Sequence, residues 1–219
     1  MKRLKKLGGA VLTGAVYALF FLPAVVMRIM YRGRVVYIDK TVKSTMKQGA
    51  VLIANHKSHA DGFFVPMMLF PLRVCTVVTR KWYDKRVLNT LFRHMPYIPI
   101  DLTKPDASWM TSAEDALKQG KCVLIFPEGK LEKDGKHEPF RSGFLLPARH
   151  LDVSVIPMAI TGDYSVFKRQ TLIVGKPIKL NLHERGRLSA VLNAASEQCE
   201  REVFALAGEE YASSGRNID

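Results

Sequence analysis

Cysteine is scarce in this chain of 219 residues, and no acidic residue precedes Asp39. The three cysteines, Cys75, Cys122 and Cys199, lie far apart and form no CxxC pair, so the sequence supports neither a disulfide framework nor a zinc knuckle. A reducing cytosol is the compartment that fits. The chain also has no internal repeat and no low-complexity tract, and its length requires no second large domain beside one substantial core.

Positive charge is in excess, and its location matters more than the net value of +13. More than half of this excess surrounds one apolar segment, because seven basic residues come before the first acidic one: Lys2, Arg3, Lys5, Lys6, Arg28, Arg32 and Arg34. No basic run is interleaved with aromatic residues. The sequence therefore does not indicate a nucleic-acid-binding protein.

The apolar segment covers residues 7–27, carries no charge and would span about 31 Å as a helix. It is too long for a signal peptide, and no small-residue cleavage site follows it before Arg28. Pro23 and the basic residues at both ends leave a spanning helix and a monotopic anchor equally open, with an apolar core helix as a third alternative. We predict a membrane anchor over residues 1–33, a catalytic domain over residues 34–219, and a position at the cytoplasmic face of the cell membrane.

After Gly33, short β-branched runs alternate with helical patterns, which predicts an α/β sandwich with a mostly parallel central sheet flanked by helices. The expected helices are residues 105–118, ending near Gly120, and an amphipathic tail from Leu188 to Leu206. The expected strands are residues 34–38, 50–54, 74–79, 122–126, 154–161 and 171–175. In such a sheet, functional loops follow the carboxyl ends of the strands.

The first candidate loop, residues 55–62, reads NHKSHADG and directly follows a predicted strand. A histidine at a strand end with an aspartate one helical turn further on can take up a proton at one ring nitrogen while the carboxylate holds the other. His56 and Asp61 fit that arrangement. Two other interpretations of the loop are a set of metal ligands and a polar turn without chemistry.

The second candidate loop, residues 125–130, reads IFPEGK and follows another predicted strand. A Pro-Glu-Gly turn holds a carboxylate rigidly and lets backbone N–H groups approach an anion. Glu128 and Gly129 are therefore candidates for substrate binding, although a simple turn is the plain alternative.

The order of motifs over residues 34–180 resembles the glycerolipid acyltransferase family, whose best-known members are 1-acylglycerol-3-phosphate acyltransferases. The motifs that carry this resemblance are, in order, NHKSHAD, YIPIDL, FPEGKLEKDGK, PFRSGFLLPARH, VIPMAI and IVGKPI. Asn55, His56 and Asp61 match the first family motif, Glu128 and Gly129 its Phe-Pro-Glu-Gly motif, and Pro157 its last motif. A membrane-associated N-terminal segment also occurs in this family.

The resemblance implies acyl transfer from acyl-CoA or acyl carrier protein to a hydroxyl of a lysophospholipid at a membrane surface, without a cofactor or a metal. His56 is then the base and Asp61 its orienting carboxylate. Substrate binding is assigned to eight residues: Asn55, Ser58, Asp101, Glu128, Gly129, Lys130, Lys133 and Arg141.

The chain departs from the family at two positions where an arginine is usual. Lys130 and Leu131 stand where members that act on glycerophosphate acceptors continue with Thr-Arg, and Leu102 follows Asp101 where an arginine is common. Lys130, Lys133, Lys104 or Arg141 could replace these arginines, although a lysine lacks the two-pronged donor geometry of a guanidinium. The expected acceptor is 1-acylglycerol-3-phosphate, and the alternatives are a lysophospholipid with another head group and a non-phosphate lipid alcohol.

Two further alternatives belong to other classes of protein. A metal hydrolase would need the pattern His-x-His-x-Asp-His, but two residues separate His56 from His59, and Gly62 stands where the next histidine should be. A membrane-anchored binding protein that kept the fold and lost catalysis is the other. The intact His56, Asp61 and Glu128 favour the enzyme.

Overall fold

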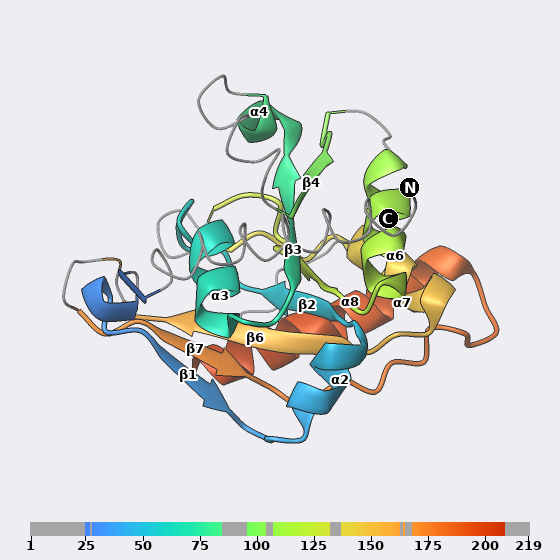
Figure 1. The fold of residues 1–219 in the computed structure, drawn as a ribbon. Coiled ribbons are helices and arrows are strands. Elements are labelled where there is room, and N and C mark those ends of the chain that lie inside the picture. Colours follow the sequence, from blue (N-terminus) through green and yellow to red (C-terminus); the bar gives the residue numbers. More distant parts are fainter. Residues whose placement is uncertain are drawn as a thin grey trace, which may run out of the picture.

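The computed structural model describes residues 25–26, 28–84, 96–103, 107–131, 137–162, 164 and 168–208, and its centre is one sheet (Figure 1). Within these residues the sheet has seven strands in the order β1-β7-β6-β2-β5-β3-β4. The strands are β1 (Arg34–Tyr37), β2 (Val51–Ala54), β3 (Val74–Thr79), β4 (Tyr97–Ile100), β5 (Cys122–Ile125), β6 (Val155–Thr161) and β7 (Thr171–Val174).

The sheet is mostly parallel, as the alternation of strands and helices predicts. The neighbouring strands β6, β2, β5, β3 and β4 all run in one direction. β7 pairs antiparallel with β6 and parallel with β1, so these two strands run against the other five. The carboxyl ends of β2 and β5 consequently meet at one edge of the sheet.

Helices cover both faces of the sheet (Figure 1). One face carries α2 (Val42–Gln48) and α3 (Asp61–Leu69). The other face carries α6 (Ser108–Lys118), the 3-10 turn η1 (Ser142–Phe144), α7 (Leu145–Leu151) and α8 (Leu188–Ala207). The short helix α4 (Arg80–Tyr83) follows β3. The side chains of strand β2 alternate between the two faces of the sheet. Val51 and Ile53 pack with α6 and α8, whereas Leu52 and Ala54 pack with α2 and α3, and all four are fully buried.

All six predicted strands are present, and the predicted tail helix is α8. The predicted helix over residues 105–118 is α6, which begins at Ser108; residues 104–106 lie outside the described part. The seventh strand, β4, was not predicted from the sequence, because Pro99 interrupts its run of β-forming residues. Proline is tolerated there because β4 is the last strand at one edge of the sheet and pairs only with β3.

Helix α3 was also missed, because Pro66 lies inside it. A proline lacks the N–H that would bond to the carbonyl four residues earlier, here that of Gly62. The Gly62 carbonyl instead accepts hydrogen bonds from the hydroxyls of Tyr97, at 3.1 Å, and Thr76, at 3.4 Å. Hydroxyl groups of β3 and β4 thus replace the N–H donor that Pro66 lacks, and these hydrogen bonds link α3 to the two strands.

The predicted membrane segment over residues 7–27 lies outside the described residues, apart from residues 25–26. Among the helices that the structure describes, none combines the length and the apolar character needed to cross a membrane. β1 begins at Arg34, the first residue of the predicted catalytic domain.

Candidate functional site

The two candidate loops meet at the carboxyl ends of β2 and β5. These strands are parallel neighbours, paired from Val51 with Val123 to Ile53 with Ile125. The backbone N–H of His56, two residues after β2 ends, donates to Oε1 of Glu128 at 2.8 Å, and Glu128 is 1% exposed. The structure therefore joins the two motifs, which are 72 residues apart in the chain, through one hydrogen bond.

The side chains of His56 and Asp61 form the predicted pair. His56 Nδ1 and Asp61 Oδ2 are 2.9 Å apart, and the same carboxylate oxygen accepts the N–H of Ser58 at 2.8 Å. Asp61 is fully buried as the first residue of α3, where the helix dipole favours a negative charge. A neutral His56 that donates from Nδ1 to this carboxylate presents its other ring nitrogen, Nε2, as a proton acceptor.

A third donor to Asp61 was not found in the sequence. The hydroxyl of Tyr164, three residues after β6 ends, donates to Oδ1 of Asp61. Burial raises the pKa of the Tyr164 phenol well above its ordinary value, and the charge of Asp61 and their hydrogen bond raise it further. No local pattern around Tyr164 marks it, because the contact joins positions 103 residues apart.

The residues beside the pair shape the loop. Asn55 is 1% exposed, and its amide donates to the carbonyl of Ile160 at 3.1 Å while its oxygen accepts the N–H of Ile160 at 2.7 Å. Asn55 therefore links the end of β2 to β6. The hydroxyl of Ser58 accepts the N–H of Ala60 at 3.2 Å. The structure thus places these two predicted substrate-binding residues in hydrogen bonds that fix the loop.

His56 lies on the wall of a cavity of about 660 Å³. Its ring stacks on Phe126, with centroids 4.3 Å apart, and its side chain is 18% exposed. Most of the remaining wall is apolar and comes from α3, β3, β4 and the residues after it, α6, η1 and the end of β5. Its residues include Phe63, Val77, Ile100, Leu102, Trp109 and Phe144. His56, which can accept a proton, therefore lies on the wall of an apolar cavity whose volume is typical of ligand-binding sites.

Among the described residues, two of the predicted basic side chains, Arg141 and Lys130, line this cavity. Gly129 has φ +68°, and the Arg141 side chain lies so close that a Cβ on Gly129 would be 3.3 Å from the guanidine Nε. Both the backbone conformation and this approach favour glycine. Lys130 is exposed, with Nζ 3.3 Å from Oε1 of Glu138. Lys133 and Lys104 lie outside the described residues.

Asp101 has a local role in the structure. Its Oδ1 accepts the N–H of Thr103 at 2.9 Å and the Thr103 hydroxyl at 2.6 Å, an arrangement typical of an Asx turn. Leu102, the residue that follows, lines the cavity and is 38% exposed. The structure therefore places the neighbour of Asp101, rather than its carboxylate, on the cavity wall.

Helix α8 holds the segment that carries Arg141. The fully buried Glu200 accepts the N–H of Phe140 at 3.3 Å, and the Ser196 hydroxyl donates to the Phe140 carbonyl at 3.1 Å. His137 Nε2 lies 3.6 Å from the other oxygen of Glu200. The N–H of Arg141 then donates to the carbonyl of Pro127 at 3.1 Å, which fixes this segment against the Pro-Glu-Gly turn.

The metal interpretation placed His59 in a ligand set. In the structure the His59 ring lies against Trp82 of α4, with centroids 4.5 Å apart. Over the described ranges, histidine, cysteine, aspartate and glutamate side chains nowhere gather in a group of three that could hold a metal ion.

Fold and site together define an α/β protein with a histidine–carboxylate pair on the wall of an apolar cavity at the carboxyl ends of parallel strands. The profile of the Acyltransferase family matches residues 34–161, from the start of β1 to the end of β6, and the chain belongs to this family. The resemblance seen in the sequence is thereby confirmed.

Named relatives are consistent with this membership. A 1-acyl-sn-glycerol-3-phosphate acyltransferase of Limnanthes douglasii is 30% identical over 142 residues, which cover 62% of this chain and 49% of that protein. One of Bacillus subtilis (strain 168) is 22% identical over 159 residues, 68% of this chain and 79% of the relative. The chain thus spans about half the length of the Limnanthes relative.

A solved structure shows the same fold. The 1-acyl-sn-glycerophosphate acyltransferase of Thermotoga maritima superposes with a TM-score of 0.62, covering 96% of this chain and 85% of that one at 19% identity. The α/β architecture with a mostly parallel sheet is therefore shared with a protein of that name.

Proposed function

We propose that this chain is an O-acyltransferase that moves a fatty acyl group from a thioester donor to the hydroxyl of a lysophospholipid, with 1-acylglycerol-3-phosphate as acceptor and phosphatidate as product. The observation that carries the proposal is the His56–Asp61 pair on the wall of an apolar cavity. The names of the relatives support the acceptor. The proposed donor is acyl-CoA or acyl carrier protein, which present the same thioester.

The geometry suits base catalysis on the acceptor itself. Nε2 of His56 removes the proton of the acceptor hydroxyl as that oxygen attacks the carbonyl carbon of the thioester. The carbonyl oxygen becomes an oxyanion, and Asp61 stabilises the imidazolium. Collapse of the tetrahedral intermediate breaks the C–S bond, and the departing thiolate takes the proton from Nε2. The products are an ester and a free thiol, and no cofactor or metal takes part.

The cavity provides room for an apolar chain. Burying a fatty acyl chain is favourable by about 0.8 kcal/mol per CH₂ group, so an apolar wall of this extent gives the donor or the acceptor much of its affinity. An acyl chain held there brings its thioester or ester end toward His56, because the histidine lies on the same wall.

We assign the acceptor head group to Arg141, with Lys130 as a second cation. Both line the cavity, and Arg141 has the guanidinium that grips a phosphate with two parallel hydrogen bonds. Arg141 thus stands in for the arginines that the family has at other positions. The ion pair of Lys130 with Glu138 reduces its contribution to the local charge.

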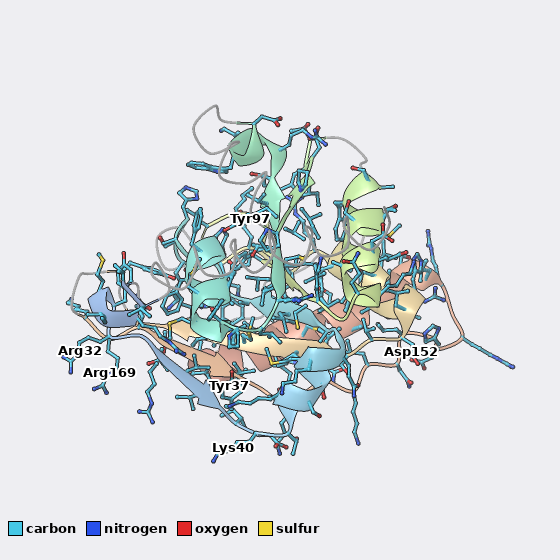
Figure 2. All side chains as sticks on the ribbon, in the orientation of Figure 1. Arg32, Tyr37, Lys40, Tyr97, Asp152 and Arg169 are labelled. Carbon is cyan, nitrogen blue, oxygen red and sulfur yellow. The ribbon has the colours of Figure 1, made fainter. Side chains whose placement is uncertain are left out.

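We place the protein on the cytoplasmic face of a membrane, anchored through residues 1–33. The described end of this segment is apolar and exposed, with Ile29 at 65% and Val26 at 43%. Arg32 and Arg169 lie together beside it and point away from the sheet (Figure 2). A cationic rim beside an apolar segment suits anionic head groups.

Release of thiol from acyl-CoA or acyl carrier protein by the detergent-solubilised full chain tests the function. The acceptors to compare are lysophosphatidate, lysophosphatidylcholine and a long-chain alcohol. We expect release with lysophosphatidate, with an acceptor KM that rises at least about tenfold in Arg141→Ala and less in Arg141→Lys. Release with the alcohol alone would show that the acceptor carries no phosphate, and no release with any acceptor would favour the binding protein.

A further inference from the structure

Among the described residues, three groups bond to the carboxylate of Asp61, and one of them comes from a distant part of the chain. His56 and the main chain of Ser58 bond to Oδ2 from the same loop. Tyr164 bonds to Oδ1 and reaches it from the segment after β6. Asp61 is completely buried, so these contacts decide both the orientation of its carboxylate and the distribution of its charge.

Tyr164 is itself held in place by aromatic packing. Its ring meets Phe64 of α3 edge to face, with centroids 5.9 Å apart and planes at 86°. It meets Tyr31 in the same way, at 5.6 Å and 82°. Such edge-to-face pairs stabilise one ring orientation. The hydroxyl therefore has a fixed direction, and because its pKa is raised it remains a proton donor over the working pH range of an enzyme.

We propose that Tyr164 is a positioning residue for His56: its hydroxyl fixes the carboxylate of Asp61 and draws charge away from it, which lowers the basicity of the histidine. This inference rests on the proposed function only for its meaning in catalysis. A carboxylate that keeps its full charge holds the imidazolium more firmly. A donor on the second oxygen weakens that hold, so the imidazolium gives its proton to the leaving thiolate more readily.

Other titratable groups also face the pair and must stay constant in a test. In the described part of the chain they are His59 after β2, Tyr97 on β4, Glu128 and Lys130 after β5, Arg141 before η1, and Tyr31, which packs on Tyr164. Tyr164→Phe removes one hydroxyl and keeps the ring that packs on Phe64, so none of these groups is altered.

The test is an NMR titration of His56 in the full chain with isotope-labelled histidine, in which His56→Ala assigns the resonance. We expect the His56 pKa to rise by about one unit in Tyr164→Phe, a roughly tenfold change in its proton equilibrium. The control is Tyr37→Phe, which removes a half-buried hydroxyl on β1 and should leave the titration unchanged. An unchanged or lowered His56 pKa in Tyr164→Phe would overturn the proposal.

A second pair of variants shows whether Tyr164 acts through the carboxylate. In an Asp61→Asn background, Tyr164→Phe should no longer move the His56 pKa, and a shift of the same size would contradict the proposed route. The titration does not depend on turnover, so it tests the effect of Tyr164 on His56 even if the chain does not catalyse acyl transfer. If acyl transfer is present, the acid limb of kcat/KM should move to higher pH by the same amount in Tyr164→Phe.

Discussion

At the scale of single residues, Asp61 supplies the charge that the proposed base needs. Replacing it with asparagine keeps the size of the side chain but removes the partner of the imidazolium. We expect kcat in Asp61→Asn to fall by about 10⁴-fold, as for comparable changes in histidine–aspartate pairs. Loss of a buried charged acceptor should also lower the free energy of unfolding by about 1–3 kcal/mol.

Asp152→Asn is the matched control for this variant, measured by thioester turnover and by denaturant unfolding. It removes a carboxylate at the end of α7, in a left-handed conformation that asparagine also adopts. Unchanged activity in Asp152→Asn together with near-normal activity in Asp61→Asn would contradict the role given to Asp61.

The three cysteines should be inert in the folded protein. Burial raises the pKa of Cys122 and Cys199 to about 12 and raises that of Cys75 as well. Because only the thiolate reacts and a raised pKa keeps the thiol protonated, alkylation by iodoacetamide should be slow at pH 7–8. Mass spectrometry after timed labelling checks this. Labelling of the native chain at the rate of the unfolded chain would contradict it.

At this scale the sequence predicted the groups that lie within one loop and missed those that act across the fold. His56 and Glu128 were predicted because each lies in a loop just after a strand, and Asp61 because it stands five residues after His56, about one helical turn further on. Tyr164 was missed because only the arrangement of β6 beside β2 brings it to Asp61. The substrate-binding roles of Asn55 and Ser58 stay predictions; the structure shows the Asn55 side chain bonded to Ile160 of β6 and the Ser58 hydroxyl bonded within the loop.

At the scale of elements, α8 supports the proposed acceptor site from outside the region that the family profile matches. Removing the Ser196 hydroxyl leaves the Phe140 carbonyl without this donor. We expect Ser196→Ala to lower the free energy of unfolding by about 1 kcal/mol and to raise the acceptor KM several-fold, because Arg141 follows Phe140. kcat at saturating acceptor and the donor KM should change little.

Asn193→Ala, at an exposed position of the same helix, is the control, and steady-state kinetics with each substrate varied in turn provides the measurement. Equal changes in the kinetic constants for both substrates, or the same changes in Asn193→Ala, would show that α8 acts on general stability alone.

The helical spacing of apolar residues made α6 and α8 predictable, and short β-branched apolar runs made six strands predictable. β2 and β5 are buried along their whole length, so a continuous apolar run rather than an alternation marks them. The elements that were missed contain a proline or are short. Pro66 in α3 and Pro99 in β4 look like breaks in a local pattern, and tertiary contacts offset both: the hydroxyls of Tyr97 and Thr76 satisfy Gly62, and β4 occupies an edge. α2 and α7 have seven residues each, too few for a clear period.

At the scale of the whole molecule, the predicted membrane anchor over residues 1–33 should carry most of the membrane binding, separately from the catalytic domain over residues 34–219. Deleting residues 1–24 removes most of the apolar segment and four of its flanking basic residues, Lys2, Arg3, Lys5 and Lys6. We expect the shortened chain to bind vesicles of phosphatidylcholine with anionic lipid at least about tenfold more weakly than the full chain, as measured by co-sedimentation. Equal binding by both chains would place the membrane contact elsewhere.

The central claim is that His56 is the base for acyl transfer to a lipid hydroxyl. The most direct measurement is formation of labelled phosphatidate from labelled acyl-CoA and lysophosphatidate by the full chain and by His56→Ala, with matched thermal unfolding. We predict formation by the wild-type chain and a loss of about 10² to 10⁴-fold in a folded His56→Ala variant. Phosphatidate formed at similar rates by both proteins would contradict the claim.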